Sequence, residues 1–521
     1  MTPLFEGVSF ASFAVIKIRG GLSQQPEVTE ADVIVVGGGG SGLAAAAEAA
    51  RLNRSVIVLE KNPQTGGTTS WSVGSVTATN TPHQKRAGIK DSPQAHFEDL
   101  ELHAGALAPR DNLALRRILV DSTTDMLEWL MRLGVVFVGP MPEPPHRHPR
   151  MHNVVPNSRS FAYHLTRHCR ELGVELCVNT HTQRLLEENG RLVGVEARTS
   201  HGSTHTFRAR CGVVLASGDY AGASDLKAKL ASADVADVEA VNASSTGDGH
   251  RMALALGARV VNGDIVRGPI MRFVPPAEAG MIRRLPPTKL VAQTIAWAMN
   301  VLPQWILRPF LMSFLTTALG PSPDLFREGA ILVNNAGERF TDELAQPAHA
   351  VAKQPNRIAY IVFDDTLAER FAAWPYFIST APGVAYAYLK DYRRNRRDIY
   401  HQATTIGGLA ASMRVPSDAL AATFERYNAE RGERPALNQR PYYALGPVKS
   451  YVVFTDGGLA VSPRLEVLRE DGSIIPGLYA AGSAGQGGLL LEGHGHHLGW
   501  AFISGRIAGR NAALDTPLTN K

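Results

Sequence analysis

The residues with the clearest capacity for chemistry lie near the C-terminus, in the segment "GSAGQGGLLLEGHGHHLGW". It carries His494, His496 and His497 among closely spaced glycines. Histidine can bind a metal ion, transfer a proton near neutral pH or satisfy a buried polar partner, and glycine lets the backbone approach a ligand closely. The segment alone leaves these chemistries open, so the elements that hold it must decide among them.

The strongest signal for such an element is near the N-terminus, in "ADVIVVGGGGSGLAAAAEAARLNRSVIVLEKN". The apolar run Val33–Val36 predicts a buried strand that leads into Gly37, Gly39 and Gly42 and then an alanine-rich helix. The first glycine permits a tight turn, the second lets a pyrophosphate approach the helix N-terminus, and the third allows close helix packing. A second strand ends at Glu60, where a carboxylate can bind ribose hydroxyls. This order of elements predicts a Rossmann-like dinucleotide site.

Four further blocks indicate which dinucleotide is bound. The loop "KNPQTGGTTSWSVGS" follows Glu60 at once and resembles the flavin-contacting segment of FAD enzymes. The stretch from Arg191 to Gly222 reads as a hairpin, a buried strand and a turn at Gly218, and "TGDGHRMALALGA" places Asp248 before a helix. The C-terminal block adds a strand, "GLYAAG", and a long helix whose N-terminal region can face the flavin.

These five blocks resemble the fumarate reductase and 3-ketosteroid dehydrogenase superfamily of FAD-dependent oxidoreductases, as do "GAILVNNAGERFTDE" and "DGSIIPGLYAAG". The likeness is closer to the 3-ketosteroid dehydrogenases. It implies an α/β fold in which a Rossmann-like FAD-binding domain, residues 30–266 and 440–521, receives an inserted α+β capping or catalytic domain, residues 267–439. Residues 1–29 are expected to form an N-terminal extension.

The resemblance also implies where FAD is held. Binding is expected to be non-covalent, because "GGTTSWSVGS" has no histidine where covalent relatives carry the residue that links the flavin. The residues expected to bind FAD are Gly37, Gly39, Gly40, Ser41, Gly42, Glu60, Lys61, Gly66, Gly67, Thr68, Thr69, Ser72, Gly74, Ala216, Ser217, Gly218, Asp248, Gly482, His497, Leu498 and Gly499.

The substrate-side positions of the superfamily argue against dicarboxylates. Pro347 stands where fumarate reductases carry the proton-donating arginine, Phe454 where they have a carboxylate-binding histidine, and Glu492 where they have a carboxylate-binding arginine. An anionic substrate would be repelled at Glu492. The substrate is therefore expected to be an apolar small molecule.

The 3-ketosteroid dehydrogenase loop, in which a tyrosine and a glycine amide hold the ketone oxygen, aligns with "LEGHG". Gly495 is kept, whereas Leu491 replaces the tyrosine. The resemblance implies that the Gly495 amide polarises a ketone, that a base removes the neighbouring proton and that hydride passes to flavin N5. The product is a conjugated enone. The same site run in reverse is an ene-reductase, and a membrane-associated electron-transfer flavoprotein is a further alternative.

His494 is the first candidate for the base, because an imidazole is poised for proton transfer near neutral pH. Glu492 is expected to orient it, and His349 or Tyr443 is the alternative base. His497 is expected to face the FAD or the helix interior.

A second histidine group, in "PPHRHPRMHNV", comprises His146, His148 and His152. We expect no metal, because no cysteine or carboxylate pattern with metal-site spacing accompanies the two histidine groups. Imidazoles near a flavin more often bind or protonate a substrate.

Composition narrows the remaining classes. A net charge of +5 spread over 521 residues gives no reason to expect nucleic-acid binding. Three cysteines, Cys169, Cys177 and Cys211, form no paired framework, which favours a reducing, cytoplasmic location. Residues 290–320 are apolar but interrupted by polar residues, so we expect a partly exposed helical surface with possible peripheral membrane contact rather than a membrane span. The electron partner is left open between a quinone and a flavoprotein.

Overall fold

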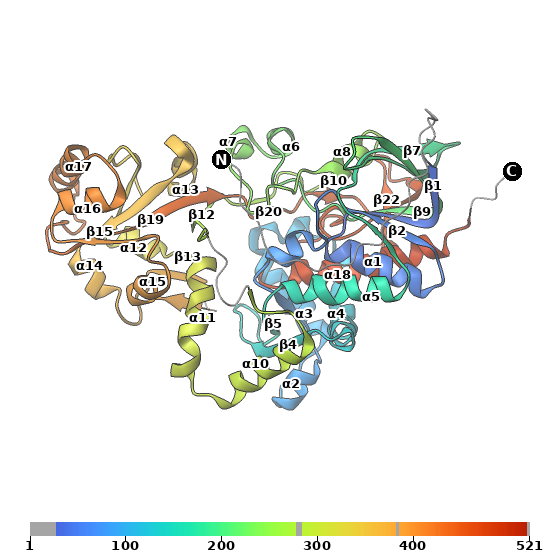
Figure 1. The fold of residues 1–521 in the computed structure, drawn as a ribbon, viewed down its shortest axis with the longest axis horizontal. Coiled ribbons are helices and arrows are strands. Elements are labelled where there is room, and N and C mark those ends of the chain that lie inside the picture. The colour runs from blue at the N-terminus through green and yellow to red at the C-terminus, as the bar shows by residue number, and fades with distance from the viewer. Residues whose placement is uncertain (1–27, 278–283, 382–384, 518–521) are drawn as a thin grey trace.

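The computed structural model describes residues 28–277, 284–381 and 385–517, and these residues form two lobes (Figure 1). Elements from both ends of the chain build the larger lobe, and elements between β12 and β19 build the smaller one. Most of the expected extension, residues 1–29, lies outside the described residues, and its last two residues already belong to β1.

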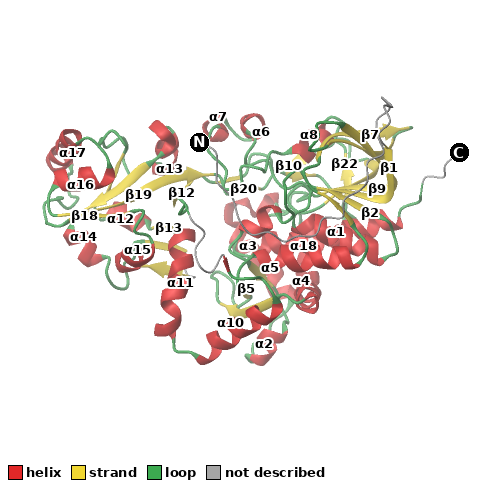
Figure 2. Ribbon diagram, in the orientation of Figure 1, coloured by secondary structure: helices red, strands yellow, loops and turns green. Residues whose placement is uncertain are grey.

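The larger lobe is organised around a mainly parallel sheet with the order β22-β23-β9-β1-β2-β6, joined through β9 by the hairpin strands β8 and β7 (Figure 2). The strand from the C-terminal block, β23, pairs in parallel with β9, so both ends of the chain share one sheet. The strands are β1 (Val28–Val36), β2 (Val56–Leu59), β6 (Glu175–Cys177), β7 (His181–Glu188), β8 (Arg191–Arg198), β9 (Thr204–Leu215), β22 (Glu466–Leu468) and β23 (Ile474–Ala480).

Two helices from opposite ends of the sequence pack tightly on this sheet. A Cβ atom added at Gly505 or Gly509 of α18 would lie 2.3 Å or 2.1 Å from a backbone carbonyl oxygen of α1, so only glycine allows this approach. The helices of the larger lobe are α1 (Gly40–Arg51), α2 (Pro82–Arg86), α3 (Pro93–Ala104), α4 (Leu113–Leu133), α5 (Arg159–Glu171), α6 (Ser224–Leu230), α7 (Ala233–Ala236), α8 (Asp248–Leu254) and α18 (His496–Leu514), with the short 3₁₀ turns η1 (Gly67–Trp71) and η2 (Gly105–Arg110).

A small antiparallel sheet, β3-β5-β4, lies beside α18. The loop between β4 and β5 comprises residues 142–150. The strands are β3 (Ser75–Thr77), β4 (Val136–Met141) and β5 (Met151–Val155), and the paired short strands of the lobe are β10 (Val260–Val261) with β21 (Gly458–Leu459) and β11 (Val266–Arg267) with β20 (Phe454–Thr455).

The smaller lobe, here called the cap, has its own sheet with the order β12-β19-β15-β14, and β18 also pairs with β19. Its strands are β12 (Ile270–Phe273), β14 (Ile331–Val333), β15 (Ala359–Phe363), β18 (Tyr400–Ala403) and β19 (Tyr442–Tyr451), beside the small sheet of β13 (Gly320–Pro321), β16 (Ser379–Ala381) and β17 (Ala385–Ala387). Its helices are α10 (Lys289–Val301), α11 (Gln304–Ala318), α12 (Pro323–Arg327), α13 (Pro347–Ala352), α14 (Asp365–Arg370), α15 (Leu389–Asn395), α16 (Ile406–Met413) and α17 (Ser417–Glu430), with the 3₁₀ turn η3 (Pro355–Arg357).

The cap boundary differs from the sequence expectation at one end. The inserted domain was expected to end at residue 439, but β19 follows that residue and pairs with β12, β15 and β18 of the cap sheet. The cap sheet therefore continues to Tyr451. Gly446 and Pro447 interrupt the strand pattern of this segment, which concealed a strand whose partners lie far away in the sequence.

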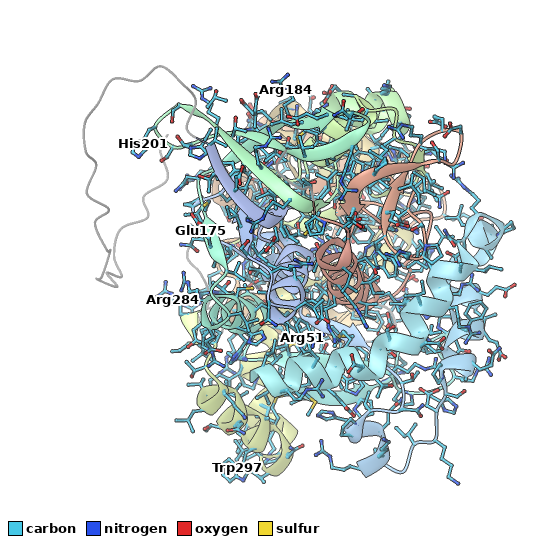
Figure 3. All side chains as sticks on the ribbon, turned by 90° about the vertical axis from the view of Figure 1, so that its right-hand side faces the viewer. Arg51, Glu175, Arg184, His201, Arg284 and Trp297 are labelled. Atoms are coloured by element: carbon cyan, nitrogen blue, oxygen red, sulfur yellow. The ribbon has the colours of Figure 1, made fainter. Side chains whose placement is uncertain are left out.

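The apolar segment 290–320 forms α10 and α11: α11 packs on α15 and β17 of the cap, and α10 lies against β4 and β5 of the larger lobe, near α2 at the bottom of Figure 1. Several large side chains on them are exposed, and Trp297 lies at the lower edge of the molecule, as Figure 3 shows. Among the described residues, no helix combines the length and the apolar character needed to cross a bilayer.

Candidate functional site

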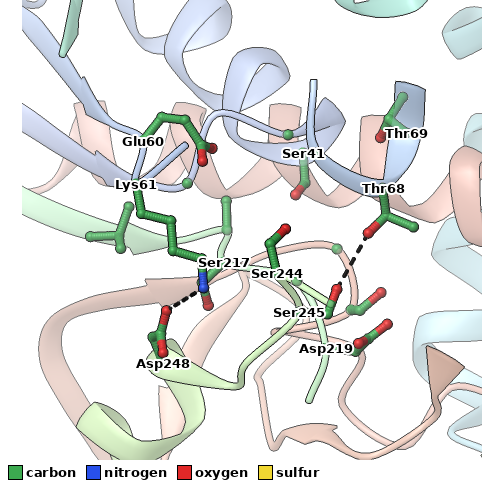
Figure 4. A pocket seen from close by; sticks show the side chains of 18 of the residues that line it. Ser41, Glu60, Lys61, Thr68, Thr69, Ser217, Asp219, Ser244, Ser245 and Asp248 are labelled. Atoms are coloured by element: carbon green, nitrogen blue, oxygen red, sulfur yellow. Dashed lines mark hydrogen bonds and ion pairs between the residues drawn. The ribbon is translucent and has the colours of Figure 1, made fainter. Parts of the chain in front are cut away.

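A cavity opens where β1, β2 and β9 meet the N-terminal end of α1 (Figure 4). Backbone and side chains from the N-terminal blocks line one part of it, and residues of the C-terminal block complete it. Parallel strands present their carboxyl ends and helix N-termini at one edge, which is where nucleotides bind in such sheets. The cavity therefore lies where the sequence predicts the dinucleotide site, and the predicted blocks of the sequence line it.

The glycines of the first turn differ in what surrounds them. A Cβ atom added at Gly39 would meet nothing within 4 Å, whereas one at Gly42 would lie 1.9 Å from the carbonyl oxygen of Gly37. Gly39 thus borders open space in the cavity, while Gly42 allows the helix to pack against the strand turn. Since the first-turn N–H groups of α1 have no intrahelical acceptors, they offer an anion site beside Gly39.

Glu60 occupies the position expected for a ribose-binding acid. Its carboxylate lines the cavity and accepts hydrogen bonds from the Gly38 N–H, at 2.7 Å, and from the backbone and side chain of Asn62, at 2.8 and 2.7 Å. These bonds fix the carboxylate while leaving lone pairs for further donors. The acid at the end of β2 therefore suits hydroxyl groups.

Two polar contacts join the separate segments that surround the cavity (Figure 4). Lys61 Nζ lies 2.7 Å from an Asp248 carboxylate oxygen, and the hydroxyl oxygens of Thr68 and Ser245 are 3.4 Å apart. Each contact links the loop after β2 to the segment around the start of α8. The fold thus holds the two flavin-contacting blocks of the sequence side by side.

Most of the residues expected to bind FAD line this cavity. They are Gly37, Gly39, Gly40, Ser41, Glu60, Lys61, Gly67, Thr68, Thr69, Ala216, Ser217, Gly218, Asp248, Gly482 and His497. Gly42, Gly66, Ser72, Gly74, Leu498 and Gly499 are not among its lining residues. Gly74, for example, packs against Val154, and the Ser72 hydroxyl donates to the Thr69 carbonyl, so these two support the loop.

At the edge of the cavity, the Phe454 ring lies 4.0 Å from the His497 ring, centroid to centroid. Burial lowers the pKa of His497 to about 4, although the nearby Asp456 carboxylate opposes the shift. Asp456 accepts a hydrogen bond of 2.7 Å from Arg267 Nε. The same guanidinium also contacts the Glu492 carboxylate.

This arrangement corrects the expected role of Glu492. The side chain pairs with Arg267 rather than orienting His494, because β11 brings the arginine beside the C-terminal loop. Burial raises the pKa of the Glu492 carboxyl, with the Arg267 charge opposing the shift. Glu492 is therefore a neutralised charge, and its repulsion of an anion is weaker than the sequence suggested.

His494 is instead held by Glu143, from the loop between β4 and β5. Its Nδ1 donates to Glu143 Oε1 at 2.5 Å, and its backbone N–H donates to the same oxygen at 2.7 Å. Burial opposes ionisation of Glu143, but hydrogen bonds and charge from His494 lower the pKa of the carboxyl below its usual value. The contact with Glu143 uses Nδ1 and leaves Nε2 of His494 free to accept a proton. The His494 side chain is 39% exposed. Neither residue is among those that line the cavity.

The two alternative bases lie in the cap. Tyr443 belongs to the cap core, where its ring stacks on Phe363 and its hydroxyl donates to Asp365 at 2.9 Å. Burial and this carboxylate raise its pKa and so disfavour the phenolate form, and its role as a base stays a prediction. His349 lies on α13, which packs against β19 and β12.

The other histidines of the two sequence groups lie at different places in the structure. His146, from the 142–150 loop, and His496, at the start of α18, are buried close together, with ring centroids 5.3 Å apart. His152 is buried in β5 and lies 2.9 Å from the Thr81 hydroxyl. His148 is only partly buried, and the three histidines of "PPHRHPRMHNV" therefore do not form one site.

The family described as "FAD binding domain" matches residues 32–281 and 303–490. The chain belongs to this family. It is an FAD-dependent oxidoreductase, and the open space at Gly39 and the acid at Glu60, both on the cavity lining, fit that cofactor. The sequence resemblance to fumarate reductases and 3-ketosteroid dehydrogenases is thereby confirmed at the level of the superfamily.

Individual relatives of this flavoenzyme carry different names. Urocanate reductase from Eggerthella lenta is 26% identical over 95% of this chain and 77% of the relative. A 3-oxosteroid 1-dehydrogenase from Mycobacterium tuberculosis is also 26% identical, over 93% of this chain and 99% of the relative. The open conformation of a flavocytochrome c3 fumarate reductase superposes with a TM-score of 0.69 at 25% identity, covering 93% of this chain and 78% of that one. These identities do not separate the branches of the superfamily.

Sequence reasoning missed several residues of this flavoenzyme that the fold places near the C-terminal loop. Glu143 lies in a proline-rich loop, Arg267 ends a two-residue strand and Asp456 follows the Phe454 position. Their partners are hundreds of residues away in the first two cases, so no local periodicity marks them. Asp456 could have been found from the sequence, because it is an acid only two residues after Phe454.

Proposed function

We propose that this flavoenzyme oxidises a CH–CH bond next to the carbonyl of an apolar, cyclic or steroid-like substrate. The observation that carries the proposal is the charge pattern beside the cavity. Arg267, the cation there, is shared between the carboxylates of Asp456 and Glu492, and the neighbouring surface is the Phe454 ring. A cation held by two carboxylates offers little to an anionic substrate, whereas an aromatic face favours an apolar one.

The chain's own groups supply the proton chemistry of this proposal. Desaturation removes one hydrogen as a proton and the other with its electron pair, and FAD, when bound, supplies the hydride acceptor. His494 Nε2 takes the proton, because Nδ1 already donates to Glu143. The Glu143 carboxylate then stabilises the imidazolium that forms. The role expected for the Gly495 amide, to polarise the ketone, stays a prediction.

The reverse reaction, reduction of a conjugated C=C bond, uses the same groups in the opposite order. Reductase names among the relatives, such as urocanate reductase, favour testing that direction as well. The proton then comes from His494, and Glu143 again orients the ring.

Anaerobic mixing tests substrate class and direction together. Oxidised holoenzyme is mixed with 3-oxosteroids and cyclic ketones, and chemically reduced holoenzyme with the corresponding enones, with fumarate, succinate and urocanate as anionic comparisons. We expect the flavin absorbance to change with a neutral carbonyl compound. Efficient turnover of fumarate or urocanate, with no response to neutral compounds, would refute the proposal.

A charge variant sharpens this test. Glu492→Gln leaves Arg267 with one carboxylate partner, Asp456, and should strengthen the binding of an anionic ligand such as fumarate. Leu490→Ile, a small change in the same loop, serves as the matched control. Unchanged or weaker fumarate binding in Glu492→Gln would show that Arg267 does not face the substrate.

We also propose that α10 and α11 rest on a membrane surface, where a quinone or a membrane-bound flavoprotein exchanges electrons with the enzyme. Exposed side chains on these helices include Leu290, Trp297 and Trp305, at 75, 63 and 75% exposure. Next to α11 packs α15, whose Arg393 and Arg394 are exposed. Apolar and tryptophan side chains beside arginines suit the interface of an anionic bilayer.

A further inference from the structure

Four histidines, three of them buried and His103 partly buried, lie together beneath the C-terminal loop, and we call them the histidine cluster. His96 and His103 come from α3, His146 from the loop between β4 and β5, and His496 from the first residue of α18. His96 Nε2 and His496 Nε2 are 3.1 Å apart, and the rings of His103 and His146 lie 4.3 Å apart. Candidate ligand atoms of His96, His146 and His496 all lie within 4.8 Å of one another.

The hydrogen bond at Nδ1 of His496 leaves its Nε2 unprotonated, with a lone pair. Its Nδ1 can only donate to the Glu492 carbonyl oxygen, so in the neutral ring Nε2 carries no proton. That lone pair accepts a hydrogen bond from His96 Nε2, 3.1 Å away, so metal binding through His96 Nε2 requires the His96 proton to lie on Nδ1. An N–H donated from the distal nitrogen to a carbonyl is the usual way in which a metal-binding imidazole is oriented.

Burial keeps these rings neutral. It lowers the pKa of His146 to about 3 and those of His96 and His496 well below the usual value, and neighbouring imidazoles add to the effect. Nε2 of His103 and Nε2 of His146 are buried without a hydrogen-bond partner among the described residues. Because an unsatisfied buried polar atom is costly, several in one place call for an explanation.

Acidic groups surround the cluster. Glu143 Oε1 binds His494, while Oε2 is buried with no hydrogen-bond partner in the described part of the chain. On the other side, an Asp99 carboxylate oxygen lies 3.8 Å from His146 Nδ1. Neutral nitrogens with a carboxylate oxygen form a donor set for a cation of intermediate softness.

Two positive charges, Arg150 and Arg147, lie beside the cluster. Arg150 donates to His146 Nδ1 at 2.9 Å, but it is bracketed by Asp91, at 2.8 Å, and Asp99, at 2.5 Å. Asp99 also pairs with Arg147 Nε at 2.6 Å, so the two carboxylates balance two guanidiniums. Because His146 Nδ1 accepts from Arg150, the neutral ring carries its proton on Nε2. Metal binding through Nε2 requires the other tautomer, in which Nδ1–H donates to Asp99 in place of the Arg150 bond.

We propose that the histidine cluster binds one zinc ion, or another divalent transition metal that prefers imidazole, through His96, His146 and His496. Zinc–nitrogen bonds of about 2.0–2.1 Å in a tetrahedron place ligand nitrogens about 3.3 Å apart. The His96–His496 separation already suits this geometry, and His146 needs a modest inward shift. Either Glu143 Oε2 or His103 completes the set.

The metal joins three parts of the larger lobe that are far apart in the sequence, namely α3, the 142–150 loop and the start of α18. It lies under the loop that carries His494 but makes no contact with the flavin cavity, whose lining contains none of the four histidines of the cluster. Its role is to hold the C-terminal loop in place. Pro142, Pro144 and Pro145 are exposed while Glu143 and His146 are buried, so a single layer of loop covers the site and opening it admits the ion.

Metal analysis of the full-length, FAD-loaded protein tests the proposal. After chelator treatment and titration with zinc, we expect about one ion per chain and a higher melting temperature. His96→Gln and His146→Gln should each weaken zinc binding by about 10- to 100-fold or more. His103→Gln and Glu143→Gln identify the fourth ligand, because only the variant that removes it lowers affinity to the same degree.

His250→Gln is the matched control, since His250 is equally buried and lies outside the cluster. It should bind zinc as the wild type does. Should the cluster variants fail to fold, cobalt-substituted wild type decides, since four-coordinate cobalt has intense visible bands and six-coordinate cobalt has weak ones. Zinc binding that is equal in wild type and His96→Gln, or wild type that binds neither zinc nor cobalt in molar excess, overturns the proposal. Flavin content is measured separately, so failure here leaves the flavoenzyme assignment intact.

Discussion

Gly39→Val is the sharpest test of where the cofactor pyrophosphate lies, because the protein itself has room for the new side chain. A Cβ at Gly39 meets nothing within 4 Å, and the residue has φ −75° and ψ −174°, which a β-branched residue adopts readily. Without FAD, the cost is that of losing a favourable N-cap residue, about 1 kcal/mol. The valine methyl groups would occupy the cavity space that the cofactor needs.

The expected loss of FAD affinity follows from the contacts that the valine blocks. Hydrogen bonds from first-turn N–H groups to a phosphate are charge-assisted and contribute about 1.5–3 kcal/mol each. Losing two of them costs about 3–6 kcal/mol, or about 10²- to 10⁴-fold in Kd. Gly42→Val serves as the contrast, because its Cβ would lie 1.9 Å from the Gly37 carbonyl oxygen and must disturb the fold.

The assay combines three measurements: the flavin-to-protein absorbance ratio after purification, FAD titration of the apoprotein, and apoprotein melting. We expect Gly39→Val to melt close to the wild-type apoprotein yet bind FAD poorly, and Gly42→Val to melt well below both. A Gly39→Val protein that retains FAD with wild-type affinity would show that the pyrophosphate does not approach this residue. Equal loss of melting temperature in both variants would refute the steric reasoning.

The remaining predictions concern the Glu143–His494 pair, the loss of stability at acid pH and the exposed surface of α10 and α11. Glu143→Gln should retain FAD and lower the rate of flavin reduction by substrate about 10²-fold, while Glu143→Asp recovers part of it; an unchanged rate would remove His494 orientation from the mechanism. His250 has a folded pKa of about 4 against about 6.5 when unfolded, so the unfolded chain binds the extra proton between these values. The contribution of neutral His250 to the free energy of unfolding is therefore complete above pH 6.5, and about 3 kcal/mol of it is lost as the pH falls from 6.5 to 4. Urea midpoints for His250→Gln should consequently vary less with pH across that window than those of the wild type. Replacing Trp297 and Trp305 with serine should reduce sedimentation with anionic vesicles but leave FAD content unchanged, and equal sedimentation would exclude α10 and α11 as the contact.

Local patterns in the sequence were enough to predict the nucleotide-binding half of the fold. The strand before Gly37, the glycine spacing, the alanine-rich helix and Glu60 lie within one short stretch, and their order alone specifies strand, turn, helix and strand. The hairpin of β8 and β9 and the helix that begins at Asp248 were equally readable. Such features depend on backbone periodicity and turn chemistry, which act over a few residues.

The substrate side was decided only by tertiary structure. Glu143 meets His494 across 351 positions of the chain, Arg267 meets Glu492 across 225, and His96 meets His496 across 400. Glu143 lies on a loop, Arg267 on a two-residue strand and His96 on α3, and nothing in the local sequence of these elements marks their partners near the start of α18. Charge compensation and burial then set what these side chains do: Glu492, read in isolation, is a repulsive charge, and beside Arg267 it is half of an ion pair.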